Sequence, residues 1–558
     1  MRKELAVVAL SALMLTGCSK KLGQFKSDFF TTNPTPLATV GEQVPGTING
    51  RIPAKFMVKN AKVTATPVIR WSDGEESATP VIIQGESVRA NGQVVSYDNG
   101  GMVAIPFTMA YQPAMAKSDL YLNFAVDQNG KIYSLPPVKV GNGVVATSTL
   151  ASAKTVTPAV AKDNFQKVIT EKYSADIHFL INQANIRANQ TDKADYIDLN
   201  KRLQEANAAP NQEIAGITVN SYASPEGTLE FNTQLAEKRE LNTTNLIENQ
   251  LKKDKITEFG ELTSSFTPED WEGFEKLVEK SNIQDKDLIL SVLRMYPDPE
   301  QREKEIRNLS AVFDELADQI LPQLRYSRVL AQINVIGKSD QELINLFNTE
   351  PSKLTADEML YIATLTNDNT KKMEVYNKAC EIFPKDYRSF NDLGMTQYVE
   401  GDYDGAEANF RHALRLQPGA KEPEMNLGLI SMVKGDYKEA ASQIGAAAGV
   451  PEASDAMGVY HLAHGDVTKA VNAFGDSKTN NAALAQILAQ DYTTAKATLG
   501  GIKNPDATTY YLNAVLGART NNEAMVMNNL RQAAKLDPKM LNRAKSDLEF
   551  SKYNLSFL

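Results

Sequence analysis

Residues that could carry covalent or acid–base chemistry are few and widely spaced in this sequence. The chain has two cysteines and four histidines. His461 and His464 lie three residues apart in a predicted helix, but two imidazoles without a third ligand make a poor metal site. No Ser–His–acid set with a nucleophile elbow, no phosphate-binding loop and no paired-cysteine motif is present. The sequence therefore predicts a non-enzymatic protein with no metal and no cofactor.

Cys18 is the residue whose surroundings predict a covalent modification. Two basic residues at positions 2 and 3 precede an apolar run over 5–15, which is too short to span ~30 Å of hydrocarbon as a helix. The Leu-Thr-Gly-Cys sequence that ends at Cys18 resembles the bacterial lipobox. This resemblance implies that residues 1–17 are removed and that the thiol takes a diacylglycerol, which gives a stable membrane anchor. The alternative is an ordinary signal peptide with a coincidental cysteine.

The residues after the cysteine bear on where the protein is sorted. Ser19 follows Cys18, and by resemblance to Gram-negative sorting rules the absence of Asp at this position favours the outer membrane. Lys20 and Lys21 follow without an acidic cluster, which favours the periplasmic face. Once Cys18 is lipidated, Cys380 is the only other cysteine, and we interpret it as part of a helical core.

The composition and net charge of the chain limit the kinds of partner that it is expected to bind. The net charge of −9 over 558 residues is mild, and no basic stripe is present to neutralise phosphates, so nucleic acid is not an expected partner.

The chain is long enough for three domains or more. Its first folded segment, 45–142, alternates apolar and polar residues over 120–126 and carries Asn-Gly and Asp-Gly turn signals, which predict an immunoglobulin-like β-sandwich. Residues 143–162 lack periodicity and are predicted to be a linker.

A strand–helix–strand–helix order is predicted next, between 163 and 338. The expected elements are a strand over 177–186, a helix over 193–208, a strand over 214–222, a helix from Thr228 and a closing strand over 328–336. The spacing of Tyr222, Gly227, Asn232, Leu235 and Arg239 resembles that of the OmpA C-terminal family. This resemblance covers about a third of the chain.

The OmpA-like resemblance implies contact with the diaminopimelate of peptidoglycan. In the family a turn Asp meets the ammonium group, and the Arg on the next helix grips the carboxylate by a charge-assisted pair. Arg239 matches that Arg, whereas Ser224 stands where the family has Asp, and Glu226 is the candidate substitute for its charge. Asn232 and Arg328 also match family positions. The alternative is a protein-docking module in which Arg239 makes an ordinary surface ion pair.

The central domain departs from the family over about 255–323, where a helical insertion is predicted. Thr267 to Asp270 form a helix start, with a Thr cap, a Pro in the first turn and acidic residues at the positive end of the dipole. A stripe that contains Trp271 and Phe274 follows at helical spacing. Such stripes usually belong to a core, and a partner groove is the alternative.

From about 353 the chain repeats. Leu393-Gly394 and Gly401-Asp402-Tyr403 recur 34 residues later as Leu427-Gly428 and Gly435-Asp436-Tyr437, a period typical of tetratricopeptide repeats. We expect five or six repeats, closed by a helix over 541–553. Such arrays bind peptides or proteins in a curved groove. The candidate groove residues are Arg388, Asn391, Met395 and Asn426, and they leave the ligand open.

The predicted fold class is a multidomain chain with an N-terminal β-sandwich, a central α/β OmpA-like domain with a helical insertion, and a C-terminal all-α tetratricopeptide-repeat solenoid. The predicted boundaries are 1–17 for the signal peptide, 18–44 for the lipid-anchored tether, 45–142 for the β-sandwich, 143–162 for the linker, 163–338 for the OmpA-like domain and 339–558 for the repeats.

Two functional hypotheses follow from these domains. The first is an outer-membrane scaffold that contacts peptidoglycan through the OmpA-like domain and recruits partner proteins through the repeats, in support of envelope assembly or secretion. The second is a protein–protein adaptor in an outer-membrane, fimbrial or secretion complex that does not bind peptidoglycan.

Overall fold

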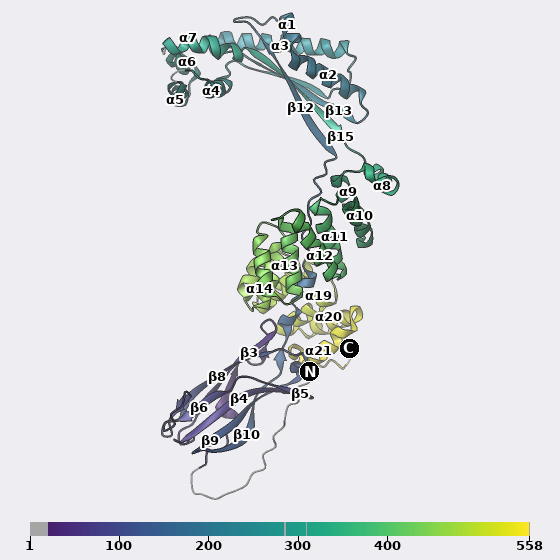
Figure 1. Cartoon of the computed structure of the whole chain (residues 1–558). Coiled ribbons are helices and arrows are strands. Elements are labelled where there is room, and N and C mark those ends of the chain that lie inside the picture. The colour runs from purple at the N-terminus through teal and green to yellow at the C-terminus, as the bar shows by residue number, and fades with distance from the viewer. Residues whose placement is uncertain (1–20, 284–285, 309, 557–558) are drawn as a thin grey trace. The chain divides into compact units, whose positions relative to one another are not determined.

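The computed structural model describes residues 21–283, 286–308 and 310–556, so Cys18 and the residues before it lie outside the described part. The chain forms two compact units, which are considered separately (Figure 1). The first unit combines the residues up to 162 with 366–558, and the second unit consists of residues 163–365. Among the described residues, no helix is both long and apolar enough to cross a bilayer.

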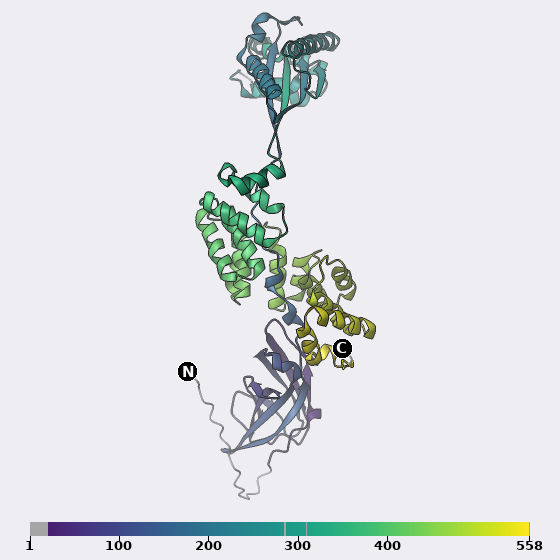
Figure 2. The ribbon, with the colours of Figure 1, turned by 90° about the vertical axis from the view of Figure 1, so that its right-hand side faces the viewer.

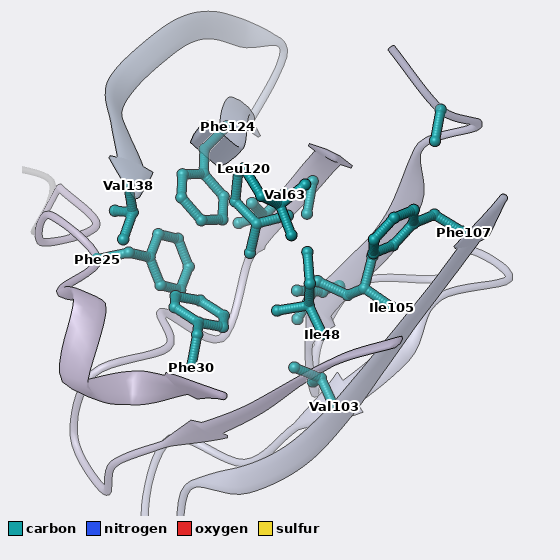
Figure 3. Close-up of a cluster of buried hydrophobic side chains, with 14 of the residues drawn as sticks. Phe25, Phe30, Ile48, Val63, Val103, Ile105, Phe107, Leu120, Phe124 and Val138 are labelled. Carbon is teal, nitrogen blue, oxygen red and sulfur yellow. The ribbon is translucent and has the colours of Figure 1, made fainter. Parts of the chain in front are cut away.

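The N-terminal part of the first unit consists of two β-sheets around one core. The first sheet has the order β1 (Phe30–Asn33), β3 (Gln43–Ile52) and β8 (Gly101–Ala110). The second has the order β10 (Lys131–Asn142), β9 (Asp119–Gln128), β4 (Ala61–Trp71), β6 (Val81–Gly85) and β7 (Gln93–Val95), with β5 (Gly74–Ser77) beside β4. Alternate residues of β8 and β9 point inward, and Figure 3 shows Ile105 and Phe124 among these core side chains.

The segment predicted to be a tether is, from Leu22 onward, part of this β-domain. Leu22, Phe25 and Phe30 are buried in the shared core, and the ring of Phe25 stacks on that of Phe124 with 4.3 Å between centroids. Beyond them, β2 (Leu37–Ala38) pairs in parallel with β11 (Val144–Val145). The prediction of a tether over 18–44 therefore needs correction over 22–44, because its aromatic residues fill the sandwich.

The C-terminal part of the first unit is a stack of helical hairpins (Figures 1 and 2). After α10 (Asn369–Ile382) the pairs are α11 (Tyr387–Glu400) with α12 (Tyr403–Leu416), α13 (Lys421–Val433) with α14 (Tyr437–Ala446), α15 (Ala453–Ala463) with α16 (Val467–Phe474), α17 (Asn480–Leu488) with α18 (Tyr492–Gly500), and α19 (Ala507–Arg519) with α20 (Glu523–Leu536). The last helix is α21 (Pro538–Ser546).

Repeated glycines allow the two helices of a hairpin to approach closely. A Cβ on Gly394 would lie 2.8 Å from the ring of Phe410, and one on Gly428 would lie 2.5 Å from Ile444. Gly458 meets Phe474 in the same way. This recurring contact confirms the predicted tetratricopeptide-type helical region. Its helices join the first unit from residue 366, whereas α8 (Asp340–Thr349) and α9 (Ala356–Thr364) belong to the second unit, so the predicted boundary at 339 is too early.

The second unit is built on a four-stranded sheet with the order β12 (Val168–His178), β15 (Tyr326–Ile336), β13 (Gln212–Tyr222) and β14 (Glu261–Thr267). β15 runs antiparallel to both of its neighbours, and β13 runs parallel to β14. Helices α2 (Ala194–Ala208) and α3 (Leu229–Lys253) pack on the sheet and share one core with it. A short helix, α1 (Ala188–Thr191), precedes α2.

Two strands of this sheet differ from the sequence-based expectation. The first strand covers 168–178, whereas the prediction was 177–186. The pattern that marks a strand was weak there, since only Ala175 and Ile177 of this strand are buried. β14 lies within the segment of about 255–323 that was predicted to be a helical insertion. The rest of that segment forms α4 (Trp271–Lys280), α5 (Lys286–Met295), α6 (Pro299–Asn308) and α7 (Ser310–Gln319), and Phe274 of the predicted stripe is buried in its core.

Candidate functional site

The groove of the repeat array contains a segment of the same chain. Residues 146–162, the strap, follow β11 and extend along the repeats. Lys162 is the last strap residue, and the second unit begins after it. Only two short 3-10 turns, Thr147–Leu150 and Ala153–Thr155, interrupt the extended path of the strap. The segment predicted to be a linker is therefore held by side chains that lie between 226 and 402 residues further along the sequence.

Two asparagines hold the C-terminal half of the strap at Ala159. The Asn426 side chain accepts a hydrogen bond from the Ala159 amide at 2.7 Å and donates one to its carbonyl at 2.8 Å. Asn391 donates to the same carbonyl at 3.0 Å and accepts from Asn426 at 3.1 Å. All three residues are fully buried. Because the Asn426 side-chain amide both donates and accepts, it matches the C=O and N–H of one extended residue, and this pair recognises main chain rather than a side chain.

Asp392 extends this network to the next inward-facing residue of the strap. Its Oδ1 accepts the Ala161 amide at 2.9 Å and the Asn391 amide at 3.0 Å. Burial raises the pKa of the Asp392 carboxyl to about 7, against the lowering effect of those hydrogen bonds and of the nearby Arg388 charge. The carboxyl group therefore titrates near neutral pH, where most aspartates are fully ionised.

The middle of the strap is held in a similar way. Asn481 accepts from the Ser152 amide at 3.0 Å and donates to the Ser152 carbonyl at 2.9 Å. The Tyr398 hydroxyl donates to the Ala153 carbonyl at 2.6 Å. The strap side chains that point into the groove are small, and Ala153 and Val156 are buried there.

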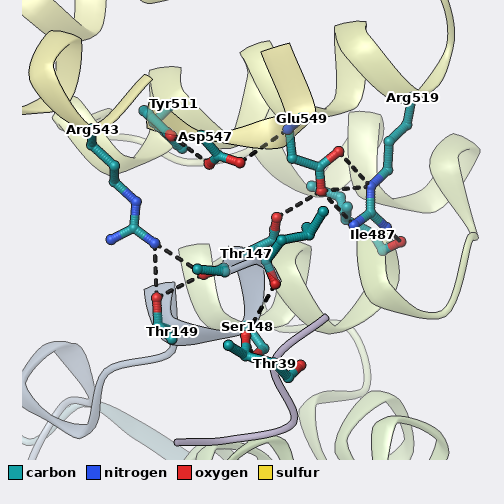
Figure 4. Close-up of polar contacts among 12 residues, drawn as sticks. Thr39, Thr147, Ser148, Thr149, Ile487, Tyr511, Arg519, Arg543, Asp547 and Glu549 are labelled. Carbon is teal, nitrogen blue, oxygen red and sulfur yellow. Dashed lines mark hydrogen bonds and ion pairs between the residues drawn. The ribbon is translucent and has the colours of Figure 1, made fainter. Parts of the chain in front are cut away.

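The N-terminal end of the strap contacts the last helices of the array (Figure 4). Arg543 donates to the Ala146 carbonyl at 3.0 Å and to the Thr149 hydroxyl at 2.8 Å. The Thr147 hydroxyl donates to Glu549 at 2.6 Å, and Glu549 pairs with Arg519 at the same distance. Because β11 immediately precedes these strap residues in the chain, the contacts attach the C-terminal end of the β-domain to the array.

Three of the four groove residues predicted from sequence contact the strap. Asn391 and Asn426 bind the strap directly, and Arg388 donates to the Lys162 carbonyl at 3.3 Å while it pairs with Asp386. Met395 is buried in α11. Sequence reasoning missed Asp392, Asn481 and Arg543. Asn481 carried a signal, since it is one of three polar residues, with Asn480 and Gln486, on a helix of Ala, Leu and Ile.

The central candidate, Arg239, is completely buried in the second unit. Its guanidinium donates to three main-chain carbonyls, those of Gln183 at 3.0 Å, Tyr222 at 2.8 Å and Leu180 at 3.3 Å. The side chain also lies over the Phe179 ring. Burial lowers the pKa of Arg239 to about 10. Arg239 thus fixes the loop after β12 to α3 through its donors, and the alternative of a surface ion pair is wrong because the side chain is inside the protein.

The turn after β13 is also occupied by protein groups. Ser224 is buried and donates to Glu226 at 2.8 Å. Glu226 forms a two-bond ion pair with Arg325 at 2.9 and 3.0 Å, and Arg307 from α6 donates to the Glu226 carbonyl. The acid that was the candidate partner for a ligand ammonium therefore already faces an arginine of the same chain.

The last two predicted residues of this domain also have partners within the chain. Asn232 is buried and donates to the Gly227 carbonyl at 3.1 Å and to Glu269 at 3.3 Å. Arg328 lies on the sheet face that points away from α2 and α3, and makes a two-bond pair with Asp176 at 2.8 and 2.7 Å. The structure does not bring Arg328 together with Arg239, because the two side chains point to opposite faces of the sheet.

The candidate residues for metal and thiol chemistry, His461 and Cys380, lie in helices of the repeat array. Among the described residues, no group of three His, Cys, Asp or Glu side chains is arranged to hold a metal ion. His461 has Asp466 as its nearest acid, at 4.0 Å. Burial raises the pKa of the Cys380 thiol to about 12, which keeps it in the unreactive thiol form.

No family model matches the chain, and no curated protein matches it. Similar solved structures include a tetratricopeptide repeat protein from Parabacteroides merdae, with 13% identity, a TM-score of 0.30 and coverage of 44% of this chain and 98% of that one. PilF of Pseudomonas aeruginosa has 16% identity, a TM-score of 0.29 and coverage of 35% and 98%. PilW, a type IV pilus biogenesis factor, has 16% identity, a TM-score of 0.28 and coverage of 33% and 94%. At such TM-scores the similarity carries no functional argument.

Proposed function

We propose that this protein is a lipid-anchored adaptor of the bacterial outer membrane that acts through protein–protein contacts in the periplasm. The observation that carries this proposal is the repeat groove, in which buried side chains of Asn391, Asn426 and Asn481 hydrogen-bond the main chain of an extended segment. An array that binds polypeptide in this way is a protein-recognition device.

The second unit is included in the proposal as a protein-docking module rather than a peptidoglycan-binding one. The donors of Arg239 are taken by three carbonyls, and Glu226 is paired with Arg325. A diaminopimelate group would have to displace buried contacts at both ends. A pull-down of the mature, lipid-free protein on purified peptidoglycan tests this point, and retention that disappears in Glu226→Gln would restore the peptidoglycan hypothesis.

The membrane anchor rests on the Cys18 motif. We expect Cys18→Ala to release the full chain from membranes on fractionation, whereas the unmodified chain stays with the outer-membrane pellet through a high-salt wash. Cys380→Ser is the matched control, because that thiol lies in the helical array and its replacement should leave fractionation unchanged. A Cys18→Ala chain that remains in the washed pellet would exclude the lipid anchor.

Recovery of partners tests the adaptor role itself. The full-length protein, tagged at its C-terminus and solubilised from outer membranes of its native host after mild crosslinking, should retain specific envelope proteins. An unrelated tagged lipoprotein of similar abundance is the control. If the two recover the same set of proteins, the adaptor proposal fails.

A further inference from the structure

The way in which the groove holds the strap shows what kind of peptide the groove accepts. The hydrogen bonds from the array to residues 152–162 go to main-chain groups of the strap, apart from one from Asn481 to the Thr155 hydroxyl. The Lys154 ammonium group also lies over the Tyr403 ring. Main-chain groups are the same in any sequence, so these contacts demand an extended backbone and not a particular set of side chains.

Side-chain selection in the groove comes from lack of space. Ala159 and Ala161 are 0% and 1% exposed, and Ala153 and Val156 are also buried. Pro158 is buried as well, whereas the other residues between them are exposed, Val160 among them at 43%. The groove therefore accepts an extended segment with small side chains at these inward positions, and it leaves the outward positions unrestricted.

Most hydrogen bonds that hold the strap go to its main chain, so another extended segment could make the same ones. Over 152–162 its buried side chains are those of three alanines, one valine and Pro158, which bury little apolar surface, and affinity from such surface scales with area. Both of its ends are joined to folded parts, β11 and β12, so its local concentration at the groove is on the order of millimolar. A weak ligand can fill a site at that concentration and still be exchanged for a stronger one.

We propose that the strap is the resting, displaceable occupant of the repeat groove, and that a partner protein replaces it with an extended segment that has small residues at the same inward positions. This inference rests on the proposed adaptor function and names the class of partner that the groove binds. The groove then excludes segments that have larger side chains at the inward positions. It accepts another segment only when that segment binds better than the strap.

Eviction of the strap tests the proposal in the full mature chain. Ala159→Arg places a long charged side chain at a fully buried position, whereas Val160→Arg places the same side chain at the outward-facing neighbour and serves as the matched control. The probe is a fluorescein-labelled synthetic peptide with the sequence of residues 150–162, and its binding is followed by fluorescence anisotropy. A second eviction variant replaces 152–162 with a Gly/Ser segment of equal length, for the case in which Ala159→Arg impairs folding.

The expected result is saturable binding of the peptide to Ala159→Arg and to the Gly/Ser variant, at concentrations below the roughly millimolar local concentration of the tethered strap. The unmodified chain and Val160→Arg should bind at least about tenfold more weakly, since the strap competes in both. Addition of Asn426→Ala to Ala159→Arg should abolish the gain. The proposal is overturned if eviction variants that keep the native circular dichroism spectrum bind no peptide. It is also overturned if the unmodified chain binds none at millimolar peptide, which would make the strap a permanent part of the fold. Neither outcome bears on whether partner proteins co-purify.

Discussion

The repeat groove and the turn after β13 both contain polar residues typical of a ligand site, and both are filled by the chain itself, but in different ways. In the groove, Asn391 and Asn426 bind the main chain of a separate extended segment. At the turn, Arg239 binds carbonyls of the loops that surround it, and Glu226 binds a neighbouring arginine. The first arrangement leaves a site that another peptide can fill. The second uses its charged groups to hold the domain together.

The largest expected effect is at the turn. Arg239→Ala removes a fully buried side chain and the donors of three partly buried hydrogen bonds, so the second unit should lose about 3 to 5 kcal/mol. Each unit contains one tryptophan, Trp71 in the first and Trp271 in the second. Urea unfolding followed by Trp271 fluorescence in a Trp71→Phe background reports this unit alone. A fully stable Arg239→Ala chain would mean that the side chain is free for a ligand.

The groove should respond less strongly to the loss of one clamp. Asn426→Ala removes both hydrogen bonds to Ala159, and we expect a loss of about 1 to 3 kcal/mol in the first unit. The readout is Trp71 fluorescence in a Trp271→Phe background. Asn409→Ala, which removes a partly buried asparagine bonded to Gln397 outside the strap contacts, is the control and should cost less than about 1 kcal/mol. Equal losses in both variants would argue against a special role for Asn426.

The pH dependence distinguishes the groove from the turn. Burial raises the pKa of Asp392 to about 7 in the folded chain, above its unfolded value of about 3.9. The folded state therefore binds the proton more tightly, and this contribution to stability is complete below about pH 4 and is lost as the pH rises to about 7. Asp392→Asn should flatten the slope of first-unit stability over that window and leave the second unit unchanged. An unaltered slope would place the titration elsewhere.

The smallest effect is expected at Arg328. Its pair with Asp176 lies on the outer face of the sheet, and the arginine side chain is 47% exposed. Exposed pairs contribute roughly 0 to 1 kcal/mol, so Arg328→Ala should lower second-unit stability by less than about 1 kcal/mol in the Trp271 assay. A loss as large as that of Arg239→Ala would show that side-chain burial does not determine how much each arginine contributes to the stability of the second unit.

Repetitive and local features of this chain could be predicted from its sequence. Gly394 and Gly428 recur because each faces a bulky side chain of the paired helix, and such steric needs leave a regular pattern. β12 was misplaced because its outward residues, such as Lys172 and Ser174, are exposed and polar, while the apolar run after it is a loop. β14 was missed for the same reason, since its pattern is almost wholly exposed.

Long-range partners could not be predicted. The strap reads as a linker because its Ala, Ser, Thr and Val residues have no periodicity of their own, and its order comes from side chains more than 200 residues away. The type and position of Arg239 were recognised, but its acceptors are carbonyls, which every residue has and no sequence pattern marks. Three of the four predicted groove residues do contact the strap, since repeat geometry fixes which positions face inward.

The central claim is that residues 146–162 occupy the repeat groove in the resting protein, and amide hydrogen exchange of the mature chain tests it most directly. The amides of Ala159 and Ala161 donate to Asn426 and Asp392, so both should exchange far more slowly than in the free peptide of the same sequence. Asn426→Ala should speed up exchange at Ala159 in particular. Exchange of both amides at the rate of the free peptide would contradict the account, because it would leave the strap unbound and the groove empty.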